Sequence, residues 1–199
     1  MSQQIVELNC PGCGARVSTG QSECEWCHKP VVITTFNSVY SMPLPEVNKY
    51  AGAYRKALGE NPQNDFLNKS IAMCYLKIKL YDKALEAFEN AIEDNFDDSE
   101  TYFYAAVCLL KGKKAFLAQR CDIEKAIEYI NAANMIEPRG LYYYFLAYIK
   151  YDFFERKYLN TTPNYVECLG LANSMGVSAY DIGMLFDILG VEIPAVLSL

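Results

Sequence analysis

Four cysteines near the start of the chain have the residue type and the spacing of a metal site. They form two C-x-x-C pairs that are separated by ten residues: Cys10, Cys13, Cys24 and Cys27. Each pair closes a tight turn that directs two sulfurs at one point, and Zn²⁺ prefers four such ligands in a tetrahedron. Gly12 and Gly14 permit the backbone of the first turn. We therefore expect a structural zinc site, with iron, which also accepts four thiolates, as the alternative.

Residues beside the second pair add further options. His28 could replace a cysteine as a ligand, but its position directly after Cys27 favours an exposed neighbour. Trp26 lies at the tip of the turn, where an exposed tryptophan could anchor a partner. A thioredoxin-like redox role requires a βαβ setting, and the flanking sequence does not provide one.

The segments on either side of the cysteines favour β-structure. Residues 5–8 and 31–35 are rich in β-branched and apolar side chains, which predicts a short hairpin or a three-stranded ribbon. A module of about thirty residues is too small to hold itself together without a staple. With its CPGCG turn, the segment 1–35 resembles a zinc ribbon. The second pair departs from that family, because Glu25, Trp26 and His28 stand where small residues are common.

The helices that would support this module are clearest in residues 65–98. Apolar residues recur there at helical spacing in two stretches separated by a tight turn. Small residues stand where two helices would approach closely, with large aromatic residues beside them: Ala72, Ala84 and Ala91, then Tyr75 and Phe88. This arrangement resembles the tetratricopeptide (TPR) pattern. The resemblance implies stacked neighbours, because one helix pair cannot bury both of its faces.

Further helices are expected on both sides of this pair. Tyr50, Tyr54 and Ala57 lie thirty-four residues before Ala84, Phe88 and Ala91, which indicates the second helix of a preceding unit. A third unit begins near residue 99 and a fourth near residue 141. Two later helices are expected, over 164–174 and 178–189. The helix-start residues are Thr161 or Thr162, before Pro163, and Ser178, and the helices should end at Gly176 and Gly190.

The expected fold is mainly α, a TPR-like α–α superhelix of about three to four helix pairs with a small N-terminal β zinc ribbon. The expected segments are a zinc ribbon at 1–35, a linker at 36–48, TPR-like repeats at 49–160 and C-terminal capping helices at 161–199. The linker is expected because Ser38, Ser41, Pro43 and Pro45 disfavour a regular element.

The third unit carries an insertion of eight residues between its helices. Its basic residues are Lys111, Lys113, Lys114 and Arg120, and it contains no acid. One interpretation is a longer turn with solvated lysines. The other is a docking loop for an acidic partner or a phosphate, because loops tolerate insertion and often carry function.

The TPR resemblance also implies a concave groove lined by the first helix of each unit. The groove positions that we expect to contact a partner are Lys69, Met73, Lys77, Phe103, Val107 and Lys111. Such a groove is mainly apolar and suits an amphipathic helix or an extended segment. The alternative is that the chain's own terminal helix fills the groove.

Composition restricts the classes of function. The net charge of −6 argues against general nucleic-acid binding, which relies on a basic surface. The sequence has neither a signal-peptide pattern nor a run of eighteen apolar residues. The other four cysteines are scattered through the chain, so we expect a reducing, cytoplasmic setting: Cys74, Cys108, Cys121 and Cys168.

These observations predict a non-enzymatic adaptor that binds a protein or peptide, with Zn²⁺ as a structural cofactor. No common catalytic motif is present, and the single histidine lies in the metal module. The alternative is a nucleic-acid-associated factor that uses the zinc ribbon and the Lys111–Arg120 loop. A third class is a redox or metal sensor. On resemblance alone, a zinc ribbon followed by TPR-like repeats is typical of a bacterial protein.

Overall fold

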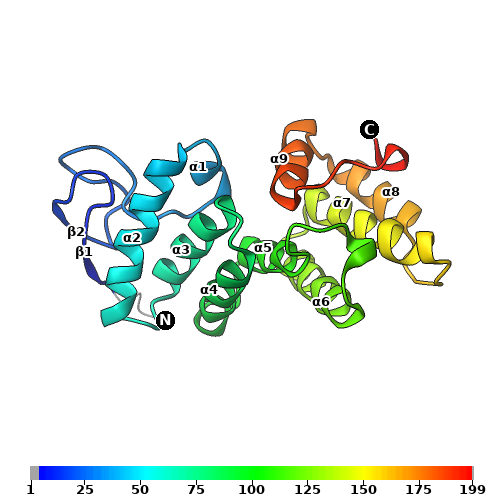
Figure 1. Cartoon of the computed structure of the whole chain (residues 1–199), viewed down its shortest axis with the longest axis horizontal. Coiled ribbons are helices and arrows are strands. Elements are labelled where there is room, and N and C mark those ends of the chain that lie inside the picture. Colours follow the sequence, from blue (N-terminus) through cyan, green and yellow to red (C-terminus); the bar gives the residue numbers. More distant parts are fainter. Residues whose placement is uncertain (1–4, 199) are drawn as a thin grey trace. The chain divides into compact units, whose positions relative to one another are not determined.

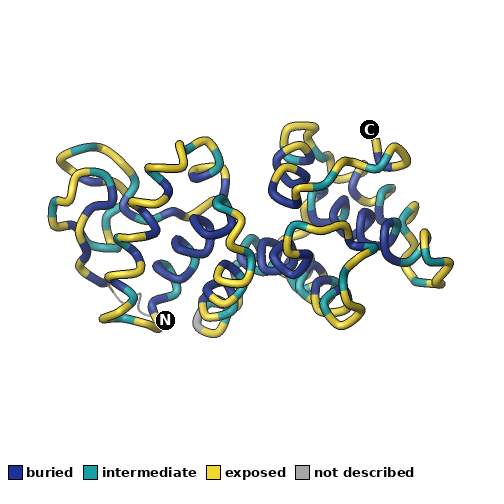
Figure 2. The backbone as a smooth tube through the Cα atoms, in the orientation of Figure 1, coloured by how far each residue is buried: buried dark blue, intermediate teal, exposed yellow. Residues whose placement is uncertain are grey.

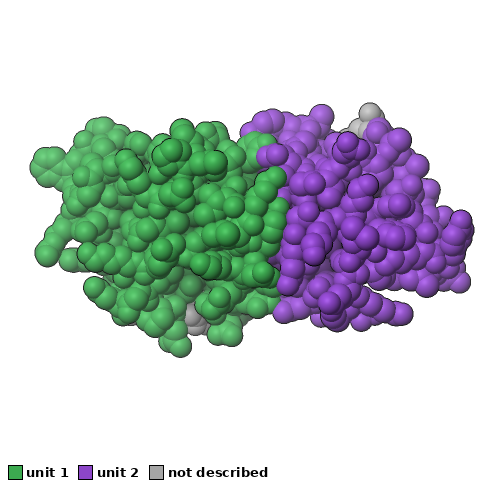
Figure 3. Space-filling model, in the orientation of Figure 1, with its two compact units in different colours: residues 1–96 green, residues 97–199 purple. Residues whose placement is uncertain are grey.

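The computed structural model describes residues 5–198, except for the side chain of Asp94. The chain divides into two compact units, residues 1–96 and 97–199, which are coloured separately in Figure 3. The described elements are mainly helices, with one small antiparallel sheet near the N-terminus, and this confirms the predicted fold class. None of the helices within 5–198 combines the length and the apolar character that crossing a bilayer requires.

The first unit begins with a two-stranded sheet. Strand β1, Glu7–Asn9, pairs with β2, Arg16–Ser18, and places Leu8 opposite Val17. Both of these apolar side chains are buried. The β-structure expected over residues 31–35 is not formed, and that prediction is wrong. This segment instead runs along the helices of the same unit, whose side chains bind its backbone.

Two helices occupy much of the stretch that we expected to be an irregular linker. Helix α1 is Phe36–Tyr40, and its Phe36 and Val39 are buried. Helix α2 is Leu44–Glu60 and begins with a proline in its first turn. Proline is tolerated there because the first N–H groups of a helix have no partner within the helix. Residues 36–48 are therefore part of the packed unit, although Ser41–Pro43 do separate the two helices.

The helix pair expected within residues 65–98 is confirmed. Helix α3 is Asp65–Lys77 and helix α4 is Tyr81–Asp94, and the two pack on each other (Figure 1). Ala72, Ala84 and Phe88 are fully buried, as their small and large side chains predict. Helix α3 also contacts α1 and α2, and it is buried along most of its length (Figure 2).

The second unit is built from five α-helices and several short helical turns within its described residues. The α-helices are α5, Ser99–Leu109; α6, Arg120–Ile136; α7, Gly140–Ile149; α8, Tyr165–Met175; and α9, Ala179–Leu189. The short elements are η1, Ala115–Leu117; η2, a π-helical turn at Lys150–Phe154; η3, Glu155–Lys157; and η4, Ala195–Leu197.

Helix α7 forms the centre of this unit. Its aromatic side chains are buried on several faces: Tyr142, Tyr144, Phe145 and Tyr148. The ring of Phe103 on α5 stacks on Tyr142 with 4.5 Å between the ring centres. Phe186 of the terminal helix α9 lies against Tyr144 and Tyr148, with ring centres 6.3 and 5.1 Å apart. The chain's own last helix therefore covers part of α7.

Local signals placed the ends of the last two helices well. The Asn164 side chain accepts hydrogen bonds from the backbone N–H groups of Val166 and Glu167, and the Glu167 carboxylate accepts one from the backbone N–H of Asn164. Ser178 caps α9, and Gly190 ends it in the left-handed conformation. The helix start that we expected at Thr161 or Thr162 lies a few residues too early, because the cap of α8 is Asn164.

We predict that Gly140→Ala destabilises the second unit. A Cβ atom at this position would lie 2.6 Å from the carbonyl oxygen of Gly176 and 2.9 Å from that of Ala172, and backbone atoms cannot move aside cheaply. We expect the free energy of unfolding to fall by about 1–3 kcal/mol in urea denaturation followed by circular dichroism. The matched control is Gly183→Ala in α9, where no atom lies within 4 Å. The control should gain stability, and an equal loss in both variants would contradict the close contact.

Candidate metal centre

The two C-x-x-C pairs form turns with the same hydrogen-bond pattern. The carbonyl oxygen of Cys10 accepts a hydrogen bond from the N–H of Gly14 at 2.9 Å. In the second turn, the carbonyl oxygen of Cys24 accepts one from the N–H of His28 at 2.8 Å. Each turn thereby directs both of its cysteine side chains to the same side of the loop.

The second turn reaches this geometry without a glycine. Gly14 has φ of +82°, and His28 at the equivalent position has φ of +55°. Both values lie in the left-handed region, which glycine adopts readily and which strains other residues. The departure from the zinc-ribbon pattern at His28 therefore leaves the turn unchanged. The imidazole itself is exposed, and the metal-binding cluster consists of the four cysteines.

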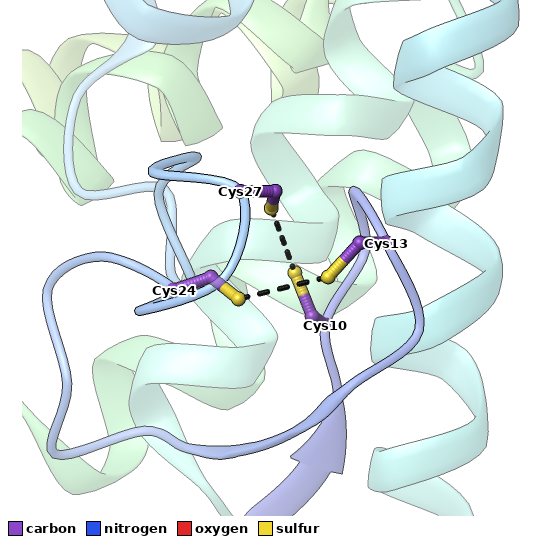
Figure 4. Close-up of side chains that lie close together, drawn as sticks. All are labelled: Cys10, Cys13, Cys24 and Cys27. Atoms are coloured by element: carbon purple, nitrogen blue, oxygen red, sulfur yellow. Dashed lines mark hydrogen bonds between the residues drawn. The ribbon is translucent and has the colours of Figure 1, made fainter.

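The four sulfurs converge on one point (Figure 4). The Sγ atoms of Cys10 and Cys27 are 3.6 Å apart, those of Cys13 and Cys24 are 3.7 Å apart, and all four lie within 4.8 Å of one another. In a tetrahedral site with metal–sulfur bonds of about 2.3 Å, the sulfurs are separated by about 3.8 Å. The residues present therefore fit a four-thiolate metal site.

Gly12 allows the two turns to approach each other. A Cβ atom on Gly12 would lie 3.1 Å from the sulfur of Cys27 and 2.8 Å from Cδ of Lys29. The ammonium group of Lys29 in turn forms an ion pair with Glu46 on α2, and this hydrogen bond raises the pKa of Lys29. The second turn is thus held between the first turn and the helix.

The pKa values of Cys24 and Cys27 are shifted in opposite directions. Burial acts to raise the pKa of Cys24, but backbone N–H groups of Trp26 and Cys27 outweigh it and, with the neighbouring sulfurs, lower that pKa to about 7. For Cys27, a backbone N–H of Lys29 favours the thiolate, but burial and the other three thiols raise its pKa to about 12. A divalent cation would favour the thiolate form of all four cysteines and bind them together.

Ser70 on α3 fixes the segment that follows the cysteines. Its hydroxyl accepts a hydrogen bond from the N–H of Ile33 at 3.0 Å and donates one to the carbonyl oxygen of the same residue at 3.1 Å. Ser70 is fully buried, and Ile33 is 1% exposed. One helical side chain therefore satisfies both backbone groups of Ile33, which is why no strand partner is needed here.

Two tyrosines of α2 bind the same segment. The Tyr50 hydroxyl donates to the carbonyl oxygen of Pro30 at 3.0 Å, and the Tyr54 hydroxyl donates to that of Val31 at 2.9 Å. Burial raises the pKa of Tyr54 well above its usual range, so its hydroxyl remains a donor. The cysteine module and the helices α2 and α3 thus form one packed body within the first unit.

The structure places the predicted groove residues in two different environments. Met73 and Val107 are fully buried, and Phe103 is 1% exposed. These three side chains belong to the cores of their units, because α3 and α5 are covered on most faces, so a partner could reach them only if the helices moved apart. Lys69 and Lys77 remain partly exposed, and the Nζ atom of Lys77 lies 4.3 Å from the ring centre of Tyr40.

The remaining predicted contact residues are at the surface. Lys111, Lys113, Lys114 and Arg120 are exposed, and Arg120 forms an ion pair of 2.7 Å with Glu124. Trp26 is 77% exposed at the tip of the second cysteine turn. The structure therefore leaves the tryptophan and the basic loop available to a partner.

The scattered cysteines are separate from the cluster. Cys74, Cys108 and Cys168 are buried, and burial raises the pKa of Cys74 to about 12 and that of Cys168 to about 11. Cys121 is exposed at the start of α6.

The residues that dock the module were not recognised as a site in the sequence. The sequence pattern indicates only that Tyr50 and Tyr54 belong to the second helix of a preceding unit, and it gives Ser70 no role. The one available signal was a serine within the otherwise apolar stretch around Ile71 and Ala72. That signal does not say which backbone the serine binds.

Comparison with known proteins adds no relative: no protein-family model matches this chain, and no curated protein does so significantly. The resemblances to zinc ribbons and to TPR proteins therefore rest on their motifs. Function must be argued from the cysteine cluster, the helices that hold it and the surfaces that they expose.

We predict that His28→Gly preserves the metal site and stabilises it. Glycine removes the strain of φ at +55°, whereas Gly14→Ala introduces such strain at +82°. Each change is worth about 1 kcal/mol, with opposite signs. Urea denaturation of the Co²⁺-loaded chain, followed by the visible absorption of the bound ion, measures both variants. A loss of stability in His28→Gly, or none in Gly14→Ala, would show that the turns are built differently.

Proposed function

We propose that this chain is a non-enzymatic adaptor, in which a zinc ribbon stapled by structural Zn²⁺ rests on TPR-like helices and contacts a protein partner. The separations between the cysteine sulfurs support a tetrahedral ion bound by four thiolates. Four protein ligands leave no open position for a substrate, which is typical of structural rather than catalytic zinc. A reducing compartment keeps such thiols available, so we place the adaptor in the cytoplasm.

The observation that carries the proposal is the exposure of Trp26. This side chain lies between two residues of the cysteine cluster, Cys24 and Cys27, and is 77% exposed. Tryptophan is enriched among the residues that dominate protein interfaces. Because the bound ion would fix the loop from both sides, little backbone freedom would be lost when a partner binds.

The helices supply the support for this contact. The cysteine turn is tied to α2 by the ion pair between Lys29 and Glu46. The following segment is tied to α3 by Ser70. In this proposal the indole of Trp26 is held on a rigid support, so that a small contact surface can recognise a partner. The TPR-like helices act in this proposal as the scaffold that stacks behind the ribbon.

We predict that Trp26→Ala abolishes capture of a specific partner while the fold and the metal content are retained. Immobilised full-length chain is incubated with a lysate of the source organism, and bound proteins are quantified by mass spectrometry. The matched control is Tyr180→Ala, which removes another exposed aromatic side chain, 63% exposed, from α9. Pretreatment of the wild-type chain with a zinc chelator provides a second arm.

At least one protein should be bound by the wild-type chain and by Tyr180→Ala, and lost with Trp26→Ala and after chelation. An identical set of bound proteins in all four samples would show that the tryptophan surface is not the partner site.

A further inference from the structure

The inserted basic loop is fixed against the end of α7. The backbone N–H of Ala115 donates to the Tyr148 hydroxyl at 3.2 Å, and the N–H of Phe116 donates to Oδ2 of Asp152 at 2.8 Å. Ala115 is fully buried, and Asp152 is 2% exposed. The loop therefore has a defined conformation, which a solvated turn would not require.

Two further basic side chains pack against the same loop, although they are distant from it in the sequence. The guanidinium of Arg156 forms an ion pair with Asp152, and its Cζ atom lies 4.7 Å from the ring centre of Phe116. The Nζ atom of Lys157 lies 4.9 Å from the same ring. The fold thus gathers basic residues from two segments of a chain whose net charge is −6.

A cleft of about 480 Å³ opens beside this loop. Lys114 contributes one wall, while Tyr148, Tyr151 and Arg156 come from α7 and the turns that follow it. Residues 192–195 also line the cleft, and the next part of the tail is anchored where the Tyr144 hydroxyl donates to the carbonyl oxygen of Leu197 at 2.5 Å. The volume is in the range of pockets that bind small organic ligands.

The charges of the cleft indicate what it would accept. Asp152 is already engaged by Arg156 and by the backbone of Phe116. Lys114 is exposed and makes no ion pair within residues 5–198, and only one of the five N–H donors of Arg156 is used by Asp152. Lys114 therefore keeps an unpaired positive charge, and Arg156, whose charge is balanced by Asp152, keeps N–H donors for one anionic group.

The rest of the lining opposes a polyanion. Glu192 also lines the cleft and would repel a second negative charge. The lining is mainly polar, and Ile193, Pro194 and the rings of the two tyrosines add a smaller apolar and aromatic part. The cleft therefore favours a ligand with one anionic head and an apolar body over a nucleic acid, whose binding requires many phosphate contacts.

We propose that this cleft binds an amphipathic carboxylic acid, with the carboxylate between Lys114 and Arg156 and the apolar body against Tyr151 and the tail. A free small acid and the end of a peptide can both supply this chemistry. The site is in the second unit and does not depend on the proposed role of Trp26.

The test uses N-acetylphenylalanine as the probe and the full-length, metal-loaded chain. Binding is followed by titration in ¹H–¹⁵N correlation spectra, which also locate the site. The neutral amide of the same compound tests the need for the carboxylate, and a hexapeptide ending in phenylalanine tests the peptide source. Inorganic triphosphate tests the polyanion alternative. The variant is Lys114→Ala, with Lys125→Ala on α6 as the control of equal charge.

The acid should bind in the millimolar range and shift the signals of residues 114, 151, 156 and 192–195, and the amide should not. Lys114→Ala should weaken binding about tenfold, as expected for loss of one charge-assisted hydrogen bond, and Lys125→Ala should leave it unchanged. Tighter binding of the hexapeptide would assign the site to a peptide end, and equal binding would assign it to a small acid. The proposal is overturned if the acid does not bind, if the amide binds equally, if triphosphate binds more tightly, or if both lysine variants weaken binding alike.

Discussion

The backbone of residues 30–33 forms one isolated β-bridge, between Pro30 and Glu23, and side chains of α2 and α3 bind other polar groups of this backbone. Ser70 binds both polar backbone groups of Ile33, while Tyr50 and Tyr54 bind the carbonyl groups of Pro30 and Val31. Unpaired backbone groups buried in this position would each cost about 1–3 kcal/mol. Separating α2 and α3 from the cysteine module would leave these backbone groups, and the side chains that bind them, without partners. The module and the two helices therefore form one folding body.

The candidate metal site would stabilise the same body through the two cysteine turns. The sulfurs of both cysteine turns meet at one point, and the second turn leads directly into the segment that Ser70 binds. Although a backbone N–H of Lys29 favours the thiolate, burial and hydrogen bonds with the neighbouring thiols raise the pKa of Cys27 to about 12, and a cation that binds all four sulfurs would favour the thiolate form. In the proposed adaptor, the same ion would fix the loop that exposes Trp26. Stability of the module and presentation of the contact surface would then have one cause.

Much of this architecture could be predicted from local patterns. The spacing of Ala72, Ala84 and Phe88 located the central helix pair, Ser178 and Gly190 marked the ends of the last helix, and the C-x-x-C pairs identified the cluster.

What the sequence did not indicate depends on contacts between distant residues. The segment 31–35 favours β-structure locally, but it is bound by helical side chains. Met73 and Val107 have a helical spacing that fits a groove or a core equally well. Met73 on α3 and Val107 on α5 are each fully buried, each within its own unit. The basic loop was recognised by its charge, whereas its attachment to Asp152 could not be foreseen, because thirty-six residues separate Phe116 from that carboxylate.

The central claim is that a bound metal ion holds the cysteine module on α3. The most direct test is amide hydrogen exchange of the full-length chain with one equivalent of Zn²⁺ and after chelation, with zinc content measured in the same samples. The N–H of Ile33, which donates to Ser70, is the reporter. We predict one zinc ion per chain, slow exchange at Ile33 in its presence, and fast exchange at Ile33 after its removal while α7 remains protected. Equally slow exchange at Ile33 in both samples, or a chain that binds no zinc, would contradict the account.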